Sequence, residues 1–242
     1  MPPLPDDPLR DRVGLLARSL VLKRASPDTL IQIASSSSTA QAEGSDPIYT
    51  EGSPAAHALL LVRGAVRLDA TIAERTVPIG WYRAGEIIGD EAVYEVAYRT
   101  TAIALGPVTF VKLPARALRA ALASDAELNF AWGNEQYRRM VETQLRLGSL
   151  GATTHVRLAA FLLNHARRFG TKRSDTNHIT LDERPTASQI AAYLGVVRQT
   201  VQRDLDKLEA LRAIERANGG GLHLFPDVLV RIAGDEGPPS SR

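Results

Sequence analysis

The clearest periodicity in the chain lies between residues 186 and 211, where apolar positions recur at helical spacing. Steps of three and four mark a first helix, with apolar residues at Ala187, Ile190, Ala191 and Leu194. Thr186 and Gln189 stand three residues apart and are typical of a capping box at a helix start. Gly195 suits the left-handed backbone that often follows a helix end. The pattern therefore predicts a short helix between Thr186 and Gly195.

A second helix follows after two more residues, and its two faces differ in character. Its inward face carries Val201, Leu205 and Leu208, whereas Arg198, Gln199, Gln202 and Arg203 form a polar face. Two short helices joined by a glycine turn are typical of a helix-turn-helix, whose second helix enters the major groove of DNA. Arginine can bond two acceptors of guanine, and glutamine can pair with adenine. A plain helical hairpin with a solvated face is the alternative.

The pattern changes between residues 47 and 113, where short β-rich runs are separated by glycine or proline turns. The runs cover residues 48–50, 59–62, 65–70, 76–81, 101–105 and 109–113. Turns return roughly every eight to twelve residues, as they do in sandwiches and barrels. This part of the sequence predicts one compact antiparallel β domain.

Helical segments flank this β region. Before it, an amphipathic helix is expected around residues 10–20, a second helix starts at Ser26-Pro27, and the four serines 35–38 indicate a loop. After it, a long helix is expected from about 125 to 150. Along that helix a seam steps by three and four through Phe130, Gly133, Tyr137, Met140, Gln144, Leu147 and Gly151. The seam predicts self-association, with packing on the chain's own β domain as the alternative.

Smaller elements surround the helix-turn-helix. We expect a helix over residues 156–169, a polar loop over 170–177 and a short strand over 179–181. Residues 216–224 place Asn218 and three glycines between apolar residues, which indicates a hairpin forming a wing. The last residues, from 234 onward, are expected to be disordered.

Composition narrows the class of protein. The 242 residues are 44% apolar and carry a net charge of +2. The charge is unevenly distributed, because residues 157–173 hold five basic side chains and no acidic one. Such a run suits a surface beside phosphates, and a solvated basic helix end is the alternative. The absence of cysteine excludes disulfides, thiolate zinc sites and cysteine-bound iron–sulfur clusters. No segment is long and apolar enough to span a membrane, so we expect a cytoplasmic protein without a membrane partner.

Enzyme motifs are also missing from the sequence. There is no GxSxG, P-loop or HExxH pattern, and the five histidines lack the spacing of metal ligands. His57 in particular has no obvious second ligand, which argues against a haem or metal role. We therefore expect neither an enzyme nor a metal site.

The order of β domain, long helix and winged helix-turn-helix resembles the CRP/FNR family of bacterial transcription regulators. The resemblance covers roughly residues 45–230 and rests on IYTEGSPAAHALLLVRGAVRL (48–68), GEIIGDEAVY (85–94), RTTA (99–102), RLAAFLLNHA (157–166) and ASQIAAYLGVVRQTVQRDLDKLE (187–209). It implies an α+β fold divided into an N-terminal helical segment (1–45), an antiparallel β-roll sensor (46–124), a dimerisation helix (125–152), a winged helix-turn-helix (153–234) and a disordered tail (235–242).

The resemblance also implies a cyclic-nucleotide site in the β-roll. The residues at the matching positions are Gly89, Asp90, Arg99, Thr100, Glu142 and Thr143. Gly89 would offer an amide, Asp90 would bond the ribose, and Arg99 with Thr100 would hold the phosphate; Glu142 and Thr143 would reach the purine from the two subunits. A guanidinium beside a hydroxyl and glycine amides makes a suitable phosphate clamp.

The sequence departs from the family pattern at this site. Asp90 stands where the family has glutamate, the loop before Arg99 is a residue shorter, and Glu142 replaces a neutral hydroxyl. A β-roll without an effector is therefore kept as the alternative to a site for a cyclic nucleotide resembling cyclic AMP.

For the DNA-binding region, the resemblance implies a homodimer on pseudo-palindromic double-stranded DNA. The expected contact residues are Thr186, Ser188, Arg198, Gln199, Thr200, Gln202, Arg203 and Lys207. Gln199 stands where the family usually has glutamate. An activator of this family would also contact RNA polymerase. A sensor whose C-terminal domain binds a protein partner is the competing hypothesis.

Overall fold

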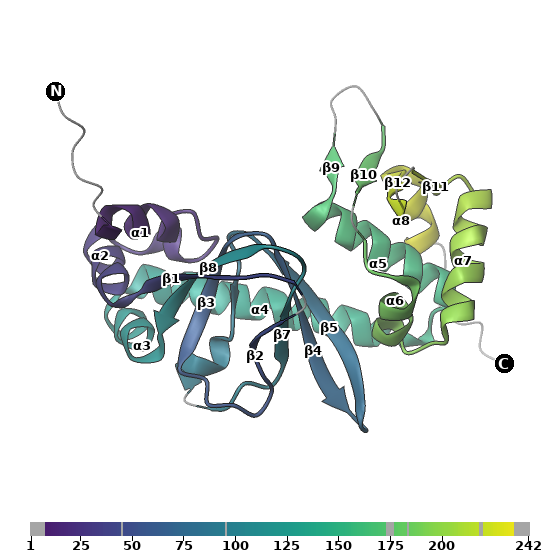
Figure 1. The fold of residues 1–242 in the computed structure, drawn as a ribbon. Coiled ribbons are helices and arrows are strands. Elements are labelled where there is room, and N and C mark those ends of the chain that lie inside the picture. Colours follow the sequence, from purple (N-terminus) through teal and green to yellow (C-terminus); the bar gives the residue numbers. More distant parts are fainter. Residues whose placement is uncertain are drawn as a thin grey trace. The chain divides into compact units, whose positions relative to one another are not determined.

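A computed structural model describes residues 8–44, 46–94, 96–172, 177–182, 184–217 and 220–234 (Figure 1). The chain divides into two compact units, Met1–Val141 and Glu142–Arg242, and each is described by itself. In the described ranges, no helix is long and apolar enough to cross a membrane. The expected disordered tail, residues 235–242, lies outside the described residues.

The first unit contains two four-stranded antiparallel sheets that form a β-roll. One sheet has the order β1-β8-β3-β6, built from β1 (Ser38–Ala42), β8 (Val108–Pro114), β3 (His57–Arg63) and β6 (Ile87–Ile88). The other has the order β2-β7-β4-β5, built from β2 (Pro47–Tyr49), β7 (Thr101–Ala104), β4 (Ala65–Ile72) and β5 (Arg75–Arg83). All six runs expected from the sequence are strands.

Strand β3 separates the two cores of this unit. Leu59 and Leu61 face the interior of the roll, where they pack with residues such as Phe110 of β8. Ala58 and Leu60 face the opposite way, into a core shared with the helices. Because both faces are buried, the strand shows a continuous apolar run instead of an alternating pattern.

The helices of the first unit cover one face of the roll. They are α1 (Pro8–Leu16), α2 (Pro27–Ser36), α3 (Ala115–Ser124) and the first part of α4 (Ala126–Gly148), with short 3-10 turns at Leu22–Arg24 and Asp90–Tyr94. The expected start of α2 is confirmed: Ser26 is its N-cap and its hydroxyl accepts from Thr29 N at 3.3 Å. The shared core includes Leu16, Ile33, Leu118 and Trp132.

The expected loop at the serine run is wrong. Helix α2 continues through Ser36, and β1 starts at Ser38. The Ser35 hydroxyl donates to Ile31 O at 2.7 Å and that of Ser37 to Ile33 O at 2.7 Å, so these serines bond the preceding helical turn. Because β1 pairs with β8, the sheet begins earlier than residue 46.

The second unit packs three helices against a small antiparallel sheet. The helices are α5 (Thr154–Phe169), α6 (Ala187–Leu194) and α7 (Arg198–Ala210); α8 (Pro226–Gly234) follows, and a 3-10 turn at Ser149–Gly151 precedes them. The sheet order is β11-β12-β10-β9, with β11 (Ile214–Arg216), β12 (Leu222–Leu224), β10 (Ile179–Leu181) and β9 (Thr171–Lys172).

The expected strand at 179–181 and the expected wing hairpin are confirmed. The turn residue Asn218 lies outside the described residues, as does part of the polar loop expected at 170–177. That loop prediction is wrong at its start, because β9 pairs with β10 there.

Candidate nucleic-acid interface and sensor site

The turn between α6 and α7 has the geometry that the sequence predicts. Gln189 N donates to Thr186 Oγ1 at 3.2 Å and Thr186 N donates to Gln189 Oε1 at 2.8 Å, which confirms the capping box. Gly195 adopts φ 68° and ψ 37°, the left-handed conformation. A Cβ at Gly195 would meet no atom of the described chain within 4 Å, so backbone conformation, not space, favours glycine here.

Helix α7 is divided sharply between a buried and an exposed face. Val201 and Leu208 are 0% exposed and Leu205 is 2% exposed, so they fix the helix on its neighbours. The exposed side chains include Arg198, Gln199, Gln202, Arg203 and Lys207. Thr200 is half-buried, and Thr186 and Ser188 are exposed at the start of α6. The structure thus gathers long polar side chains along the first turns of α7.

Three exposed polar side chains of α7 make only long contacts in the described part of the chain. The Arg203 side chain is 75% exposed and its Nε lies 3.4 Å from Asp204 Oδ1. Gln202 Nε2 donates to Asp206 Oδ1 at 3.4 Å. Lys207 Nζ lies 3.4 Å from Nε2 of His155, at the start of α5. Because such long contacts are weak, a phosphate or base could replace them at little cost.

Two arginines that the sequence did not single out hold α6 in place. Arg146 Nη2 donates to Tyr193 O at 2.6 Å, and its guanidinium lies 3.6 Å from the centre of the Tyr193 ring. Arg157 donates to Leu194 O. Both satisfy carbonyls at the C-terminal end of α6, where a positive charge is also favoured by the helix dipole. Arg157 therefore binds the protein itself, although the basic run suggested a role beside phosphates.

A further tie joins the wing to α7. Arg216 of β11 donates to Asp206 and to Glu209, both on α7. The pKa of Arg216 is raised, first by the hydrogen bond to Asp206 and then by the charge of Glu209. The acidic residues near the end of α7 therefore position the wing. Most of the basic and amide side chains of α7 lie in its first turns.

In the first unit, Arg139 of α4 connects the helix to the glycine-flanked turn after β6. Its Nη2 donates to Ile87 O at 2.5 Å, its Nη1 lies 3.4 Å from Asp90 Oδ1, and its Nε donates to Glu135 Oε1 at 2.9 Å. Burial raises the pKa of Glu135, but the hydrogen bond from Arg138 and the charge of Arg139 outweigh it, and the pKa is lowered. Asp90 is therefore already bound to a cation of its own unit.

Two stacked tyrosines cover Gly89. The rings of Tyr49 and Tyr98 are 3.9 Å apart and inclined by 12°, and the Tyr98 hydroxyl donates to His57 O at 2.7 Å. Gly89 has φ 68°, and a Cβ there would lie 3.0 Å from Tyr98 Cε1 and 3.4 Å from Tyr49 Cε1. Burial raises the pKa of Tyr49, so this phenol stays neutral. The rings occupy the space directly beside Gly89.

The residues expected to clamp a phosphate differ in exposure. Thr100 is 5% exposed, and neither its hydroxyl nor that of Tyr49 makes a hydrogen bond of normal geometry among the described residues. The two hydroxyls still interact: burial raises the pKa of Tyr49, and Thr100 opposes that larger effect by lowering it. Arg99 is exposed, while its backbone N donates to Glu91 Oε1 at 3.1 Å. The other two expected contacts, Glu142 and Thr143, lie past the unit boundary on α4, so their role stays a prediction.

Among the described residues, no group of three or more histidine, aspartate or glutamate side chains is arranged to hold a metal ion.

Comparison with known families gives two matches that follow one another along the chain. Residues 40–125 match the cyclic nucleotide-binding domain, and residues 156–227 match the Crp-like helix-turn-helix domain. The chain belongs to the CRP/FNR family. It is a DNA-binding transcription regulator with a sensory domain like those that bind cyclic nucleotides, and the family comprises regulators, not enzymes.

Individual relatives agree with this assignment. The global nitrogen regulator of Synechococcus elongatus is 28% identical over 189 residues, covering 72% of this CRP/FNR chain and 80% of the relative. FixK2 of Bradyrhizobium japonicum superposes with a TM-score of 0.71 at 21% identity, covering 81% of this chain and 96% of FixK2. A CRP/FNR-family regulator of Thermus thermophilus gives a TM-score of 0.61 at 25% identity, covering 83% of this chain and 100% of that regulator.

For this CRP/FNR regulator, the fit of a cyclic nucleotide depends on the tyrosine pair. The buried hydroxyl of Thr100, which makes no hydrogen bond of normal geometry among the described residues, is the kind of group that a phosphate would satisfy. Against this, the two rings fill the space beside Gly89, and Asp90 is bound to Arg139.

Proposed function

We propose that the regulator acts as a homodimer that reads a pseudo-palindromic DNA site with the first turns of α7. The observation that carries this proposal is the exposure of Arg198, Gln199 and Arg203 on a helix whose other face is fully buried. Side chains held in this way by a packed helix can reach base edges in the major groove without rearrangement of the protein.

Each exposed group has a base or phosphate that it suits. Arg198 and Arg203 each match the two major-groove acceptors of guanine, and the amide of Gln199 matches adenine. Gln202 and Thr200 can bond bases or the adjoining backbone. The remaining polar residues, Thr186, Ser188 and Lys207, are suited to phosphate oxygens, where they would fix the register of α7 without reading sequence.

The proposed dimer rests on apolar side chains exposed along α4. Phe130 is 70% exposed, Tyr137 is 63%, Met140 is 49% and Leu147 is 60%. Since Phe130, Tyr137 and Met140 remain exposed within the unit that contains the β domain, packing on that domain does not cover them. A second copy would bury them and would impose the two-fold symmetry that places DNA half-sites about 34 Å apart.

Selection of bound sequences from random double-stranded DNA tests the proposal. The purified full chain should enrich an inverted repeat whose half-sites lie about one helical turn apart. The double variant Arg198→Ala/Arg203→Ala should lose the enriched guanines. If the wild type enriches no sequence over the starting pool, α7 is not a reader of bases, and a C-terminal domain that binds a protein becomes the better hypothesis.

A cyclic nucleotide remains the second candidate for control of the regulator, favoured by the buried hydroxyl of Thr100, which makes no hydrogen bond of normal geometry among the described residues. Binding would require the tyrosine rings beside Gly89 to move. Calorimetry with cyclic AMP tests this: if heat of binding is seen, Arg99→Ala should weaken it by roughly 2–4 kcal/mol, because a charge-assisted pair is lost. Absence of binding by the wild type would favour a β-roll without a nucleotide effector.

A further inference from the structure

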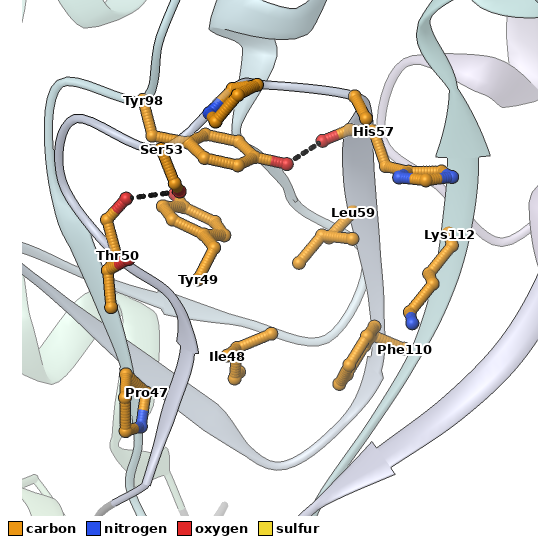
Figure 2. A pocket seen from close by; sticks show the side chains of 12 residues that line it. Pro47, Ile48, Tyr49, Thr50, Ser53, His57, Leu59, Tyr98, Phe110 and Lys112 are labelled. Carbon is orange, nitrogen blue, oxygen red and sulfur yellow. Dashed lines mark hydrogen bonds between the residues drawn. The ribbon is translucent and has the colours of Figure 1, made fainter.

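A cavity of about 420 Å³ lies at one end of the β-roll (Figure 2). Its walls come from β2, from the turn that follows it, and from the facing strands β3 and β8. Its lining combines the apolar side chains of Ile48, Leu59 and Phe110 and the rings of Tyr49 and Tyr98 with polar groups, and polar atoms make up the larger part of the exposed wall. The volume falls in the range of pockets that hold small organic molecules.

The polar groups of the cavity are cationic or neutral donors. Lys112 on β8 stands opposite Leu59 on β3, so its side chain lies on the cavity face, and His57 lies two residues before Leu59 on that strand. Across the described part of the chain, no carboxylate lies within ion-pair distance of Lys112 Nζ. Burial and the nearby charge of Lys112 lower the pKa of His57, so its ring is neutral near pH 7 and retains one N–H donor.

The cavity is separate from the residues matched to the nucleotide site. Tyr49 and Tyr98 line the cavity and also contact Gly89, so the stacked pair forms a wall between the two places. In this structure Tyr98 is anchored, because its hydroxyl donates to His57 O, its N donates to Ser53 O at 2.9 Å, and its O accepts from Gly52 N at 2.8 Å. Figure 2 shows the tyrosine pair on one side and His57 with Lys112 on the other.

We propose that this cavity is a ligand site of the sensor domain and that it takes a small aromatic carboxylate. The carboxylate would accept from Lys112 Nζ and from the His57 ring, and the aromatic ring would pack against Phe110 and Tyr98. The Lys112 ammonium has no ion-pair partner among the described residues and lies in the cavity wall, which favours an anion, because a charge-assisted hydrogen bond is stronger where water is partly excluded. Flat walls of tyrosine and phenylalanine favour an aromatic body, because stacked and edge-to-face contacts suit them.

This inference goes beyond the proposed DNA reading and does not depend on it. A ligand here would press on Tyr98, which directly precedes Arg99 and Thr100 in the chain. The site therefore differs in place and in ligand chemistry from one for a cyclic nucleotide, and binding is measured without DNA.

Titration calorimetry of the full chain with 1-naphthoate tests the proposal, and the uncharged 1-naphthalenemethanol serves as the matched ligand. We expect 1-naphthoate to bind and the alcohol to bind at least tenfold more weakly. Lys112→Met keeps the aliphatic stem and removes the charge, so it should weaken 1-naphthoate about tenfold or more and leave the alcohol unchanged. Lys112→Arg should retain binding of the acid to within a few fold.

Lys23→Met is the control, since Lys23 is exposed in the short turn after α1 and lies outside the cavity lining. It should bind 1-naphthoate like the wild type. The proposal is overturned if the wild type gives no binding heat at millimolar 1-naphthoate. It is also overturned if Lys112→Met binds the acid as tightly as the wild type, or if Lys23→Met weakens binding as much as Lys112→Met does.

Discussion

Replacement of Phe130 and Tyr137 by aspartate should separate the proposed dimer into monomers. The two residues stand seven apart on α4 and are 70% and 63% exposed in the single chain. Full burial of such a side chain contributes about 1.5–3 kcal/mol. A symmetric dimer buries four such side chains, so after scaling by these exposed fractions the double substitution removes about 4–8 kcal/mol of association free energy. That corresponds to a dissociation constant about three to six orders of magnitude higher, before the cost of placing carboxylates at the seam.

Sedimentation velocity at low micromolar concentration measures this effect directly. The wild type should sediment as a dimer, and Phe130→Asp/Tyr137→Asp as a monomer with unchanged far-ultraviolet circular dichroism. Ile72→Asp is the matched control, because Ile72 is 56% exposed on β4 and does not belong to the seam; it should leave the dimer intact. If the double variant and the wild type sediment as the same species, the seam on α4 does not hold the protomers together.

Two further predictions concern stability. Asp125 accepts from Leu128 N at 3.0 Å and from Ser26 N at 2.9 Å, and these hydrogen bonds lower its pKa from 3.8 to about 2. Because the folded pKa is depressed, this stabilisation is present above about pH 4 and disappears as the pH falls toward 2. Urea unfolding should therefore show that Asp125→Asn is less stable than the wild type at pH 7 and nearly as stable at pH 2. A difference in stability that does not change with pH would contradict the assignment. Gly195→Ala should lower the free energy of unfolding by about 1–2 kcal/mol, because alanine must adopt φ 68°. Gly14→Ala, inside α1 with no atom of the described chain within 4 Å of its new Cβ, should raise it by about 0.5–1 kcal/mol, and equal midpoints for the two variants would refute this reasoning.

The elements around the helix-turn-helix were the most predictable part of the fold. The capping box at Thr186, the left-handed Gly195 and the apolar stripe of α7 are local signals, set by residues three or four apart. Strand β1 could not be predicted from the sequence, because it depends on a distant partner and not on a local signal. Thr39 is its one residue type favoured in strands, and its serine, alanine and glutamine residues carry little β signal; the strand forms because β8 provides a partner about seventy residues later. Strand β6 has only two residues, too few to show any period.

The contacts within the site were less predictable than its residue types. The exposed polar face of α7 follows from helical periodicity, but the arginine–carbonyl contacts that hold α6 join residues 37 to 47 positions apart. The same holds for the sensor domain, where Arg139 reaches across 52 positions to Ile87 O. The stacking of Tyr49 on Tyr98 depends on how the end of β2 meets the loop before β7, so the sequence motif matched to a nucleotide gave no sign that these rings cover Gly89.

The most direct test of DNA reading by α7 is a competition assay for Gln199→Glu against a panel of single-base variants of the selected site at fixed salt. An amide both donates and accepts and suits adenine, whereas a carboxylate only accepts and selects the amino group of cytosine. The variant should therefore shift preference toward cytosine at one position of each half-site, by about 1–3 kcal/mol, with the guanines opposite Arg198 and Arg203 unchanged. A base profile identical to that of the wild type would contradict the claim that this face of α7 reads the DNA sequence through Gln199.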